Sequence, residues 1–124
     1  MIKGIGVDLT DKYRFKILIE KYGNKIASKL LSSKEFNEYN NSSNKASFLS
    51  KRFAAKEALS KAFGYGLYRY GFYLKQITIE HDPYGKPFFS FSKMFLDNTV
   101  SKYKNIQLSI SDSDDQSIAF VTIE

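Results

Sequence analysis

Two carboxylates stand apart from the other acids of the chain and are candidates for holding a metal ion. Asp8 closes a short apolar strand over residues 2–7, and Glu57 lies in an alanine-rich helix that also carries Lys and Arg side chains. A hard divalent cation such as Mg²⁺ binds carboxylate oxygens and accepts substrate phosphates into its remaining positions. These residue types therefore indicate chemistry on a phosphorylated cofactor.

Each of these charged residues also has an ordinary structural explanation. Glu57 and Lys61 are four positions apart, in the favourable orientation for a surface ion pair that contributes up to about 0.5 kcal/mol. Arg52 and Lys56 are equally compatible with solvated charges, and Asp8 with a helix cap after a strand. The combination of these residues with a glycine-spaced strand and a Tyr-Gly-Lys-Pro turn favours the metal site.

Composition sets the limits of the fold and of its partners. The chain has 124 residues, a net charge of +6 and no Cys, which predicts one domain over residues 1–124 without disulfides or thiolate chemistry. No signal peptide and no apolar run of about 20 residues is evident, so we expect a cytoplasmic protein without a membrane partner. The positive charge attracts polyanions, including nucleic acid, phosphorylated small molecules and acidic proteins. Basic residues crowd the first third, as a docking face or as an ordinary solvated helix.

The hydrophobic pattern predicts an α+β fold, with a small, mostly antiparallel sheet packed against a long alanine-rich helix and shorter helices. Gly4, Gly6 and Asp8 share one face of the first strand. In the long helix the alanines face the sheet, while Lys56, Glu57 and neighbouring polar residues lie on the opposite, solvent-facing arc. We expect helices over about 10–22, 24–31, 33–38, 47–63 and 92–102, and strands over 2–7, 76–81, 88–91, 106–111 and 117–123.

Several motifs follow one another in a distinctive order. Residues 4–9 read Gly-Ile-Gly-Val-Asp-Leu and are followed by Arg14, and residues 52–64 read Arg-Phe-Ala-Ala-Lys-Glu-Ala-Leu-Ser-Lys-Ala-Phe-Gly. A Gly-Lys-Pro turn at residues 85–87 and a final hairpin complete the pattern. Over nearly its whole length the chain therefore resembles the holo-acyl-carrier-protein synthases, the small 4′-phosphopantetheinyl transferases.

The resemblance implies a reaction and a metal site. Asp8 and Glu57 would ligate Mg²⁺, which would also contact the pyrophosphate of coenzyme A. The reaction would move 4′-phosphopantetheine from coenzyme A to a serine of apo acyl carrier protein and release adenosine 3′,5′-bisphosphate, in support of fatty acid biosynthesis. We expect Asp8, Glu57 and Lys61 to be the catalytic residues, with Glu57 a candidate acceptor of the serine proton.

The residues expected to bind the cofactor lie in the long helix and in the Gly-Lys-Pro turn. Lys56 and Lys61 would contact phosphates, and Arg52 could hold the 3′-phosphate of coenzyme A bidentately. An ordinary strand-joining turn explains Gly85 and Pro87, but leaves Lys86 unexplained. The full set is Arg52, Lys56, Lys61, Gly64, Gly85, Lys86 and Pro87.

The resemblance also implies two protein partners. Arg14 matches the arginine that contacts the carrier protein in the family, and an acidic carrier would be drawn to the basic first helix. Family members of this length form homotrimers with sites at subunit junctions, so we expect a homo-oligomer here. No nucleic-acid partner is expected.

One departure from the family leaves alternatives open. Asp112 stands where the family usually has histidine after Ser-Ile-Ser, and it either assists at the site or points away as a hairpin-turn acid. This change is the support for a catalytically impaired relative that only binds carrier protein. A basic module that stacks single-stranded nucleic acid on its aromatic residues is the other alternative, and it gives Asp8 and Glu57 no task.

Overall fold

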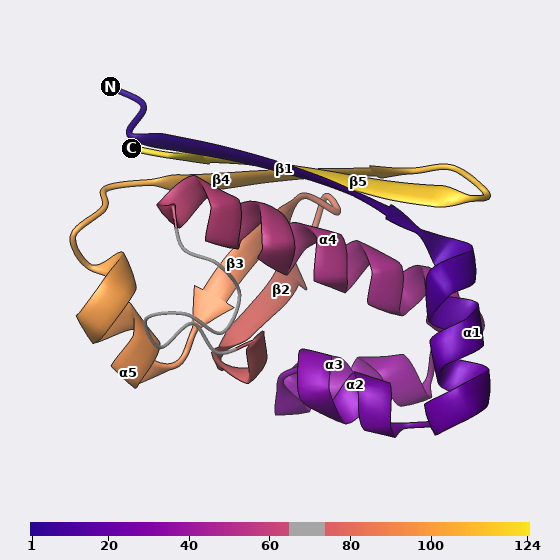
Figure 1. Ribbon diagram of the computed structural model, residues 1–124. Helices are drawn as coiled ribbons and strands as arrows, with labels where there is room; N and C mark the ends of the chain where they lie inside the picture. Colours follow the sequence, from indigo (N-terminus) through magenta and orange to yellow (C-terminus); the bar gives the residue numbers. More distant parts are fainter. Residues whose placement is uncertain (65–73) are drawn as a thin grey trace.

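The first and last strands of the chain pair in one sheet. Strand β1 (Gly4–Asp11) lies beside β5 (Gln116–Ile123), and β5 lies beside β4 (Ile106–Asp112), all antiparallel; we call this sheet A. The computed structural model describes residues 1–64 and 74–124, and in it sheet A forms one layer across the molecule (Figure 1). Asp8 pairs with Ala119 inside β1 and does not follow the strand, because β1 extends four residues beyond the predicted end.

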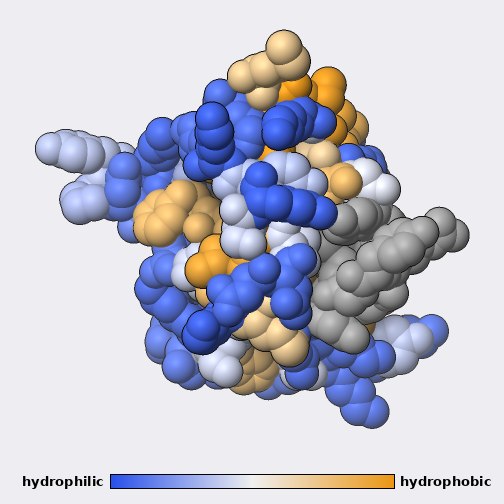
Figure 2. Space-filling view, turned by 90° about the vertical axis from the view of Figure 1, so that its left-hand side faces the viewer, coloured by the Kyte–Doolittle hydropathy of each residue, from blue (hydrophilic) through white to orange (hydrophobic). Residues whose placement is uncertain are grey.

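The outer face of sheet A is apolar and exposed. Ile5, Val7 and Leu9 are 61%, 49% and 59% exposed, and they lie next to exposed side chains of β5 in the register, with Val7 opposite Phe120 and Leu9 opposite Ile118. Figure 2 views the molecule from the left of Figure 1 and shows hydrophobic atoms exposed at the top, the level of sheet A. The alternation predicted for this strand is therefore confirmed, with the apolar residues facing outward.

The long helix α4 (Lys45–Phe63) packs against the inner face of sheet A at very short range. A Cβ atom on Gly6 would lie 1.9 Å from the carbonyl oxygen of Ala58, and one on Gly4 would lie 2.1 Å from that of Ala62. No other residue type fits between a strand and a helix backbone at this separation. The two glycines thus fix where β1 sits along α4.

The ends of α4 are set by local chemistry. The side chain of Asn44 accepts a hydrogen bond of 3.0 Å from the backbone N–H of Ser47, so the helix begins two residues before the predicted start. At the other end Gly64 adopts φ 83°, a left-handed conformation that favours glycine, as expected.

Three shorter helices surround the N-terminal half of α4. They are α1 (Lys12–Tyr22), α2 (Lys25–Leu30) and α3 (Ser33–Asn40). A reciprocal pair of hydrogen bonds between Ser32 and Glu35 caps the start of α3. The first two helices match the predicted segments, and α3 continues two residues beyond the predicted 33–38, into residues expected to form a loop.

A two-stranded antiparallel sheet lies on the side of α4 away from sheet A (Figure 1). It consists of β2 (Ile77–His81), preceded by a 3-10 turn over residues 74–76, and β3 (Pro87–Phe91). The single helix predicted over 92–102 is wrong in detail, since a short helix α5 (Lys93–Phe95) continues as a π-helical turn (Leu96–Val100). No helix in the described residues has the length and apolar character needed to cross a membrane.

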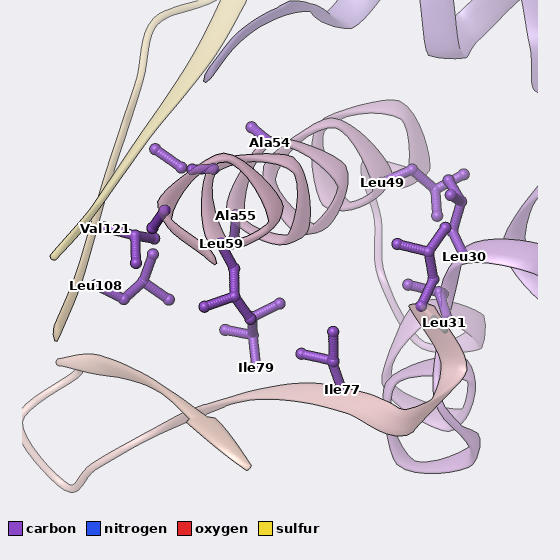
Figure 3. Packing of buried hydrophobic residues seen from close by; sticks show 14 of the residues in the cluster. Leu30, Leu31, Leu49, Ala54, Ala55, Leu59, Ile77, Ile79, Leu108 and Val121 are labelled. Atoms are coloured by element: carbon purple, nitrogen blue, oxygen red, sulfur yellow. The ribbon is translucent and has the colours of Figure 1, made fainter. Parts of the chain in front are cut away.

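The core fills the space around α4. Figure 3 shows Leu59 pointing toward Ile79 of β2, with Val121 of sheet A nearby, while Leu49 meets Leu30 at the other end. Burying a side chain of this size stabilises the fold by about 1.5–3 kcal/mol. Because both sheets and three helices cover α4, little of its surface is left for water.

This covering overturns one prediction about α4. Lys56 and Ser60 were expected to face solvent, but they are 0% and 1% exposed. The expected α+β architecture, with a small antiparallel sheet against an alanine-rich helix, is confirmed.

Candidate active site

The close packing of β1 on α4 brings the two predicted metal ligands together. Asp8 shares the inward face of β1 with Gly6, and Glu57 immediately precedes Ala58, whose carbonyl oxygen Gly6 approaches. Burial raises the pKa of Glu57, and the charge of Asp8 raises it further. The negative charge of Asp8 thus acts on Glu57 across the contact between β1 and α4.

Lys61 completes this cluster from the next turn of α4. Its ammonium donates a hydrogen bond of 3.0 Å to the carbonyl oxygen of Val7, and Nζ lies 3.4 Å from Oδ1 of Asp8. The positive charge of Lys61 lowers the pKa of Glu57, against the effects of burial and Asp8. The Lys61 side chain is half exposed, so this cation borders the acids and remains accessible to a ligand.

The carboxylate of Asp8 is itself held in place. Its Oδ2 accepts a hydrogen bond of 2.7 Å from the hydroxyl of Thr10, and its side chain is only 13% exposed. Asp8 and Glu57 together carry more negative charge than Lys61 can balance. Such a pair suits a hard cation, because Mg²⁺ is bound by one or two carboxylates and completes its shell with water and substrate oxygens. No group of three or more metal-ligating side chains occurs in residues 1–64 and 74–124, so a metal here would rest on this pair.

Arg14 lies beside the same acids. Its guanidinium sits 5.3 Å from the ring centre of Phe53 on α4, and its charge lowers the pKa of Glu57. The side chain is exposed on α1. The predicted carrier-binding residue is thus part of the neighbourhood of Asp8 and Glu57.

Lys56 points in a different direction, into the interior. Its Nζ donates hydrogen bonds to Oε1 of Glu35 at 2.6 Å and to the carbonyl oxygens of Leu30 and Leu74 at 2.7 and 3.0 Å. Burial lowers its pKa to about 8, despite the attraction of Glu35. All three protons of the ammonium are engaged and the side chain is fully buried, which does not favour the predicted phosphate contact.

Sequence reasoning missed Glu35 as the partner of Lys56. The signal was present, because Ser32 and Glu35 have the spacing of a capping box. What the spacing did not reveal is that the same carboxylate also binds a lysine 21 positions away.

A second group of predicted residues meets in a separate cleft of about 280 Å³. Arg52 of α4 reaches it together with Gly85 and Pro87, from the turn between β2 and β3. Gly85 has φ 88°, and Asp82 ties the turn together by accepting hydrogen bonds at Oδ1 from the N–H groups of Tyr84 and Lys86 at 2.8 and 2.9 Å. The structure thus brings three of the predicted cofactor-binding residues into one cavity.

The other two predicted cofactor residues lie elsewhere. The Lys86 side chain is exposed on the turn and does not line the cleft. Gly64 follows the last residue of α4, about three helical turns beyond Arg52, and adjoins residues 65–73, which lie outside the described part of the chain.

Asp112 also lines the cleft, at the end of β4. It forms an ion pair of 2.7 Å with Lys12, and this hydrogen bond lowers the pKa of Asp112. Its negative charge is therefore compensated from α1. The residue ends the strand before the hairpin turn and also lines the cavity, so it does not point away from it; a part for Asp112 in the reaction stays a prediction.

The chain is similar to known proteins over its full length. Residues 4–121 match the family model of the 4′-phosphopantetheinyl transferase superfamily. The chain is 46% identical to the holo-[acyl-carrier-protein] synthase of Nitrosospira multiformis, over 100% of this chain and 99% of that protein. It is 43% identical to the holo-[acyl-carrier-protein] synthase of Anaplasma phagocytophilum, over 99% and 98% of the two chains.

Solved structures agree with this similarity. The structure matches the holo-[acyl-carrier-protein] synthase of Neisseria meningitidis with a TM-score of 0.90 at 36% identity, over 100% of this chain and 99% of the other. It matches the holo-(acyl-carrier-protein) synthase of Bacillus anthracis, solved in complex with CoA (3′,5′-ADP), with a TM-score of 0.80 at 30% identity, over 99% and 96%. The fold and the paired acids thus define a phosphopantetheinyl transferase type of protein. This chain belongs to the 4′-phosphopantetheinyl transferase superfamily.

Proposed function

We propose that this protein is a holo-acyl-carrier-protein synthase, which transfers 4′-phosphopantetheine from coenzyme A to a serine of apo acyl carrier protein. Adenosine 3′,5′-bisphosphate is the second product, and the reaction takes place in the cytoplasm in support of fatty acid biosynthesis. The observation that carries this proposal is the placement of Asp8, with Lys61 at 3.4 Å, where its charge acts on Glu57, in a chain whose relatives bear this name. The coenzyme A complex of a similar structure supports the identity of the donor.

Asp8 and Glu57 are the residues that would hold Mg²⁺. Their mutual repulsion is the structural reason, because a cation between them relieves it. When bound, Mg²⁺ neutralises charge on the phosphates of the donor. Lys61 contributes a second, fixed positive charge at the edge of the acids, where phosphoryl-type transfer needs stabilisation of developing negative charge.

Glu57 is also the candidate to accept the proton of the serine hydroxyl. A raised pKa makes a carboxylate a stronger base than an ordinary surface glutamate, and burial together with Asp8 produces this shift here. Thr10 and Lys61 both contact the carboxylate of Asp8. Glu57 is therefore the better candidate of the two acids for accepting a proton.

The basic surface beside these acids suits an acidic carrier protein. Arg14 is exposed on α1 and close enough to Glu57 to affect its charge, so a carrier bound at Arg14 would bring its serine near the acids. Further basic side chains of α1 and α2 extend this surface, namely Lys16, Lys21, Lys25 and Lys29. Such complementarity accelerates association and weakens as salt is added.

The exposed outer face of sheet A supports the proposal of a homotrimer. Val7 and Phe120 are direct cross-strand neighbours that stay 49% and 46% exposed in a single chain. Apolar residues gathered on one sheet face mark a surface that pairs with another protein. A second copy of the chain is the natural occupant, and the number of copies follows from the family.

The direct experiment is to incubate the protein with coenzyme A, MgCl₂ and apo acyl carrier protein and to look for the phosphopantetheine adduct by mass spectrometry. Glu57→Gln should abolish the adduct while leaving thermal unfolding nearly unchanged. Asp97→Asn, which removes an exposed carboxylate paired with Lys93, is the control and should keep full activity. Carrier binding without an adduct, with several carrier proteins, would instead identify a catalytically impaired relative.

A further inference from the structure

The cleft that contains Arg52 also contains the single histidine of the chain. His81 ends β2 and lines this cavity together with Asp112 and with Lys51 and Arg52 of α4. His81 lies outside the motifs in which this chain resembles the family. In the family the histidine follows Ser-Ile-Ser, whereas in this chain that position is Asp112 and the imidazole enters the same cavity from another strand.

We propose that His81 is a binding residue of this cleft, which receives a phosphate monoester between the imidazole, Arg52 and Lys51 and takes up a proton as the phosphate binds. The inference rests on the proposed function, because the 3′-phosphate is the phosphate monoester of coenzyme A. It deepens that function by naming the residue that couples donor binding to pH.

Arg52 is prepared for an anion before any ligand arrives. Its side chain is only 7% exposed, and its guanidinium carbon lies 4.3 Å from the ring centre of Phe48. Glu35 and Glu38 flank it at 3.4 and 3.7 Å. Within the described residues its buried Nε faces Oε2 of Glu35 without forming a hydrogen bond, so the contact to Glu35 is electrostatic. A guanidinium fixed in this way binds a phosphate without first losing conformational entropy.

The net charge of the cavity also suits an anion. Asp112 is the carboxylate of its lining, and Lys12 pairs with it at 2.7 Å. Lys51 and Arg52 are the cations of the lining; of the two acids beside Arg52, Glu35 is paired with Lys56 and Glu38 lies 3.7 Å away. A phosphate therefore meets a positive cavity, although an acid has replaced the usual histidine of the family.

His81 responds to these same charges. Burial and the cations Arg52 and Lys51 lower the pKa of His81, while Glu38 of α3 and Asp82 of the adjoining turn act in the opposite direction. The imidazole is thus mainly neutral near pH 7 in the free protein. A phosphate dianion offsets the two cations, which raises the pKa of His81 and favours its protonated, hydrogen-bond-donating form.

The sign of the pH dependence follows from this change. Because the bound state holds one more proton than the free state between the two pKa values of His81, the affinity for the phosphate rises as pH falls through that interval. The phosphate monoester has its own second pKa near 6, and a cationic site would make it lose a proton on binding. Proton uptake at pH 7 therefore reports the protein and not the ligand.

Isothermal titration calorimetry in two buffers of different ionisation enthalpy measures this uptake directly. At pH 7 coenzyme A should bind with uptake of up to about one proton, and dephospho-coenzyme A, which lacks the 3′-phosphate, with none. His81→Gln should remove the uptake and weaken coenzyme A binding about threefold to tenfold at pH 6.5, with little change at pH 8.5. His81→Arg should restore the affinity without restoring the uptake.

Turnover provides a second readout that a purely structural role would not give. His81→Gln should raise the KM for coenzyme A at pH 6.5 and leave kcat nearly unchanged, since His81 lies in the cleft apart from the paired acids. Equal proton uptake in the wild type and in His81→Gln would overturn the inference. So would a His81→Gln variant that weakens the binding of dephospho-coenzyme A as much as that of coenzyme A. Because His81 is exposed, both variants should unfold at the wild-type temperature.

The outcomes separate this inference from the proposed function. Coenzyme A binding with histidine-dependent proton uptake but without transfer to any carrier would sustain the inference and refute the transferase. Transfer to a carrier, together with coenzyme A binding and proton uptake that His81→Gln leaves unchanged, would support the transferase and refute the inference. A wild-type protein that binds no coenzyme A would refute both.

Discussion

Lys56 and Glu35 form a fully buried ion pair, with Nζ of the lysine 2.6 Å from Oε1 of the glutamate. Glu35 also accepts hydrogen bonds from the backbone N–H groups of Ser32 and Ile79 at 3.0 and 3.2 Å. One carboxylate thereby joins the start of α3, the middle of β2 and α4. The helix that carries Glu57 and Arg52 is anchored through this pair.

Removing one partner of this pair should strongly destabilise the fold. Lys56→Met leaves the charge of Glu35 buried, and we expect a loss of about 3–5 kcal/mol in the free energy of unfolding, measured by urea denaturation. The double variant Glu35→Leu with Lys56→Met should recover part of this loss, because no charge is then left unpaired. Lys93→Met, at an exposed pair, should cost at most about 1 kcal/mol. A loss below about 1 kcal/mol for Lys56→Met would contradict the account.

Gly6→Ala should disturb both the fold and the site. The added methyl group would sit 1.9 Å from the carbonyl oxygen of Ala58, so β1 has to move away from α4, at a cost of about 1–3 kcal/mol. Since the same movement separates Asp8 from Glu57, transfer should fall more than the stability loss explains. Ser109→Ala, at an exposed position of β4, is the matched control and should change neither quantity. The comparison needs urea denaturation and the mass-spectrometric assay on the same preparations.

Asp8→Asn should stabilise the metal-free protein and make it insensitive to magnesium. Removing the charge of Asp8 lowers the pKa of Glu57, while the amide oxygen can still accept the hydrogen bond of Thr10. The gain should stay below about 1 kcal/mol, because solvent screens this half-buried site. Thermal unfolding with and without MgCl₂ tests both statements, and a variant that MgCl₂ still stabilises as much as wild type would exclude this metal site.

The pH dependence of stability has a definite sign for the same pair. The raised pKa of Glu57 means that the native state binds more protons than the unfolded state above the ordinary glutamate pKa of about 4.3. Stability from this group is therefore present at lower pH and is lost as pH rises through the native pKa. In Asp8→Asn the slope of unfolding free energy against pH should be shallower in this interval, as measured by denaturation at a series of pH values.

Val7→Lys should prevent assembly without unfolding the chain. Val7 is 49% exposed on the outer face of sheet A, so lysine is tolerated in one chain but places a charge in the proposed contact between copies. Sedimentation should give the mass of a single chain for the variant and three times that mass for wild type. Met94→Lys, at another exposed apolar position on α5, should leave the mass of the wild type unchanged. An unaltered mass for Val7→Lys would refute the contact.

Arg14→Glu should impair carrier binding more than the chemical step. Reversal of this exposed charge should raise the KM for acyl carrier protein about tenfold or more, with a smaller effect on kcat, because a rim charge mainly governs encounter. The wild-type KM should rise with added salt, whereas that of the variant should respond less. Lys93→Glu, a charge reversal on α5, is the matched control.

Local patterns in the sequence were sufficient for most of the elements. The alternation along β1 gave the correct face for Gly6 and Asp8, and the helix predicted over about 10–22 contains α1. These features depend on residues within one or two turns of each other. The pairing of the two acids was predicted through the resemblance, and its cause, the contact of Gly6 with Ala58, is a relation between distant segments.

Contacts between distant segments account for what the sequence did not reveal. Helical periodicity placed Lys56 on the polar arc of α4, but α3 and β2 cover that arc and provide Glu35 as its partner. Similarly, His81 and Asp112 are 31 positions apart in the sequence and line the same cavity only because the β2–β3 turn and the end of β4 come together in the fold. Periodicity identifies the faces of an element, but not which faces come into contact.

Strand β1 has a different task on each side, with Gly6 and Asp8 toward α4 and Val7 and Leu9 toward solvent. A shift of its pairing with β5 by one residue would exchange the two sets, since successive side chains point in opposite directions. In a chain with this shift, Asp8 would lie on the outer face of sheet A in place of Val7 and Leu9. A chain with a displaced Asp8 carboxylate would therefore also lose the apolar surface through which we propose that copies of the chain contact one another, so the site and the assembly would fail together.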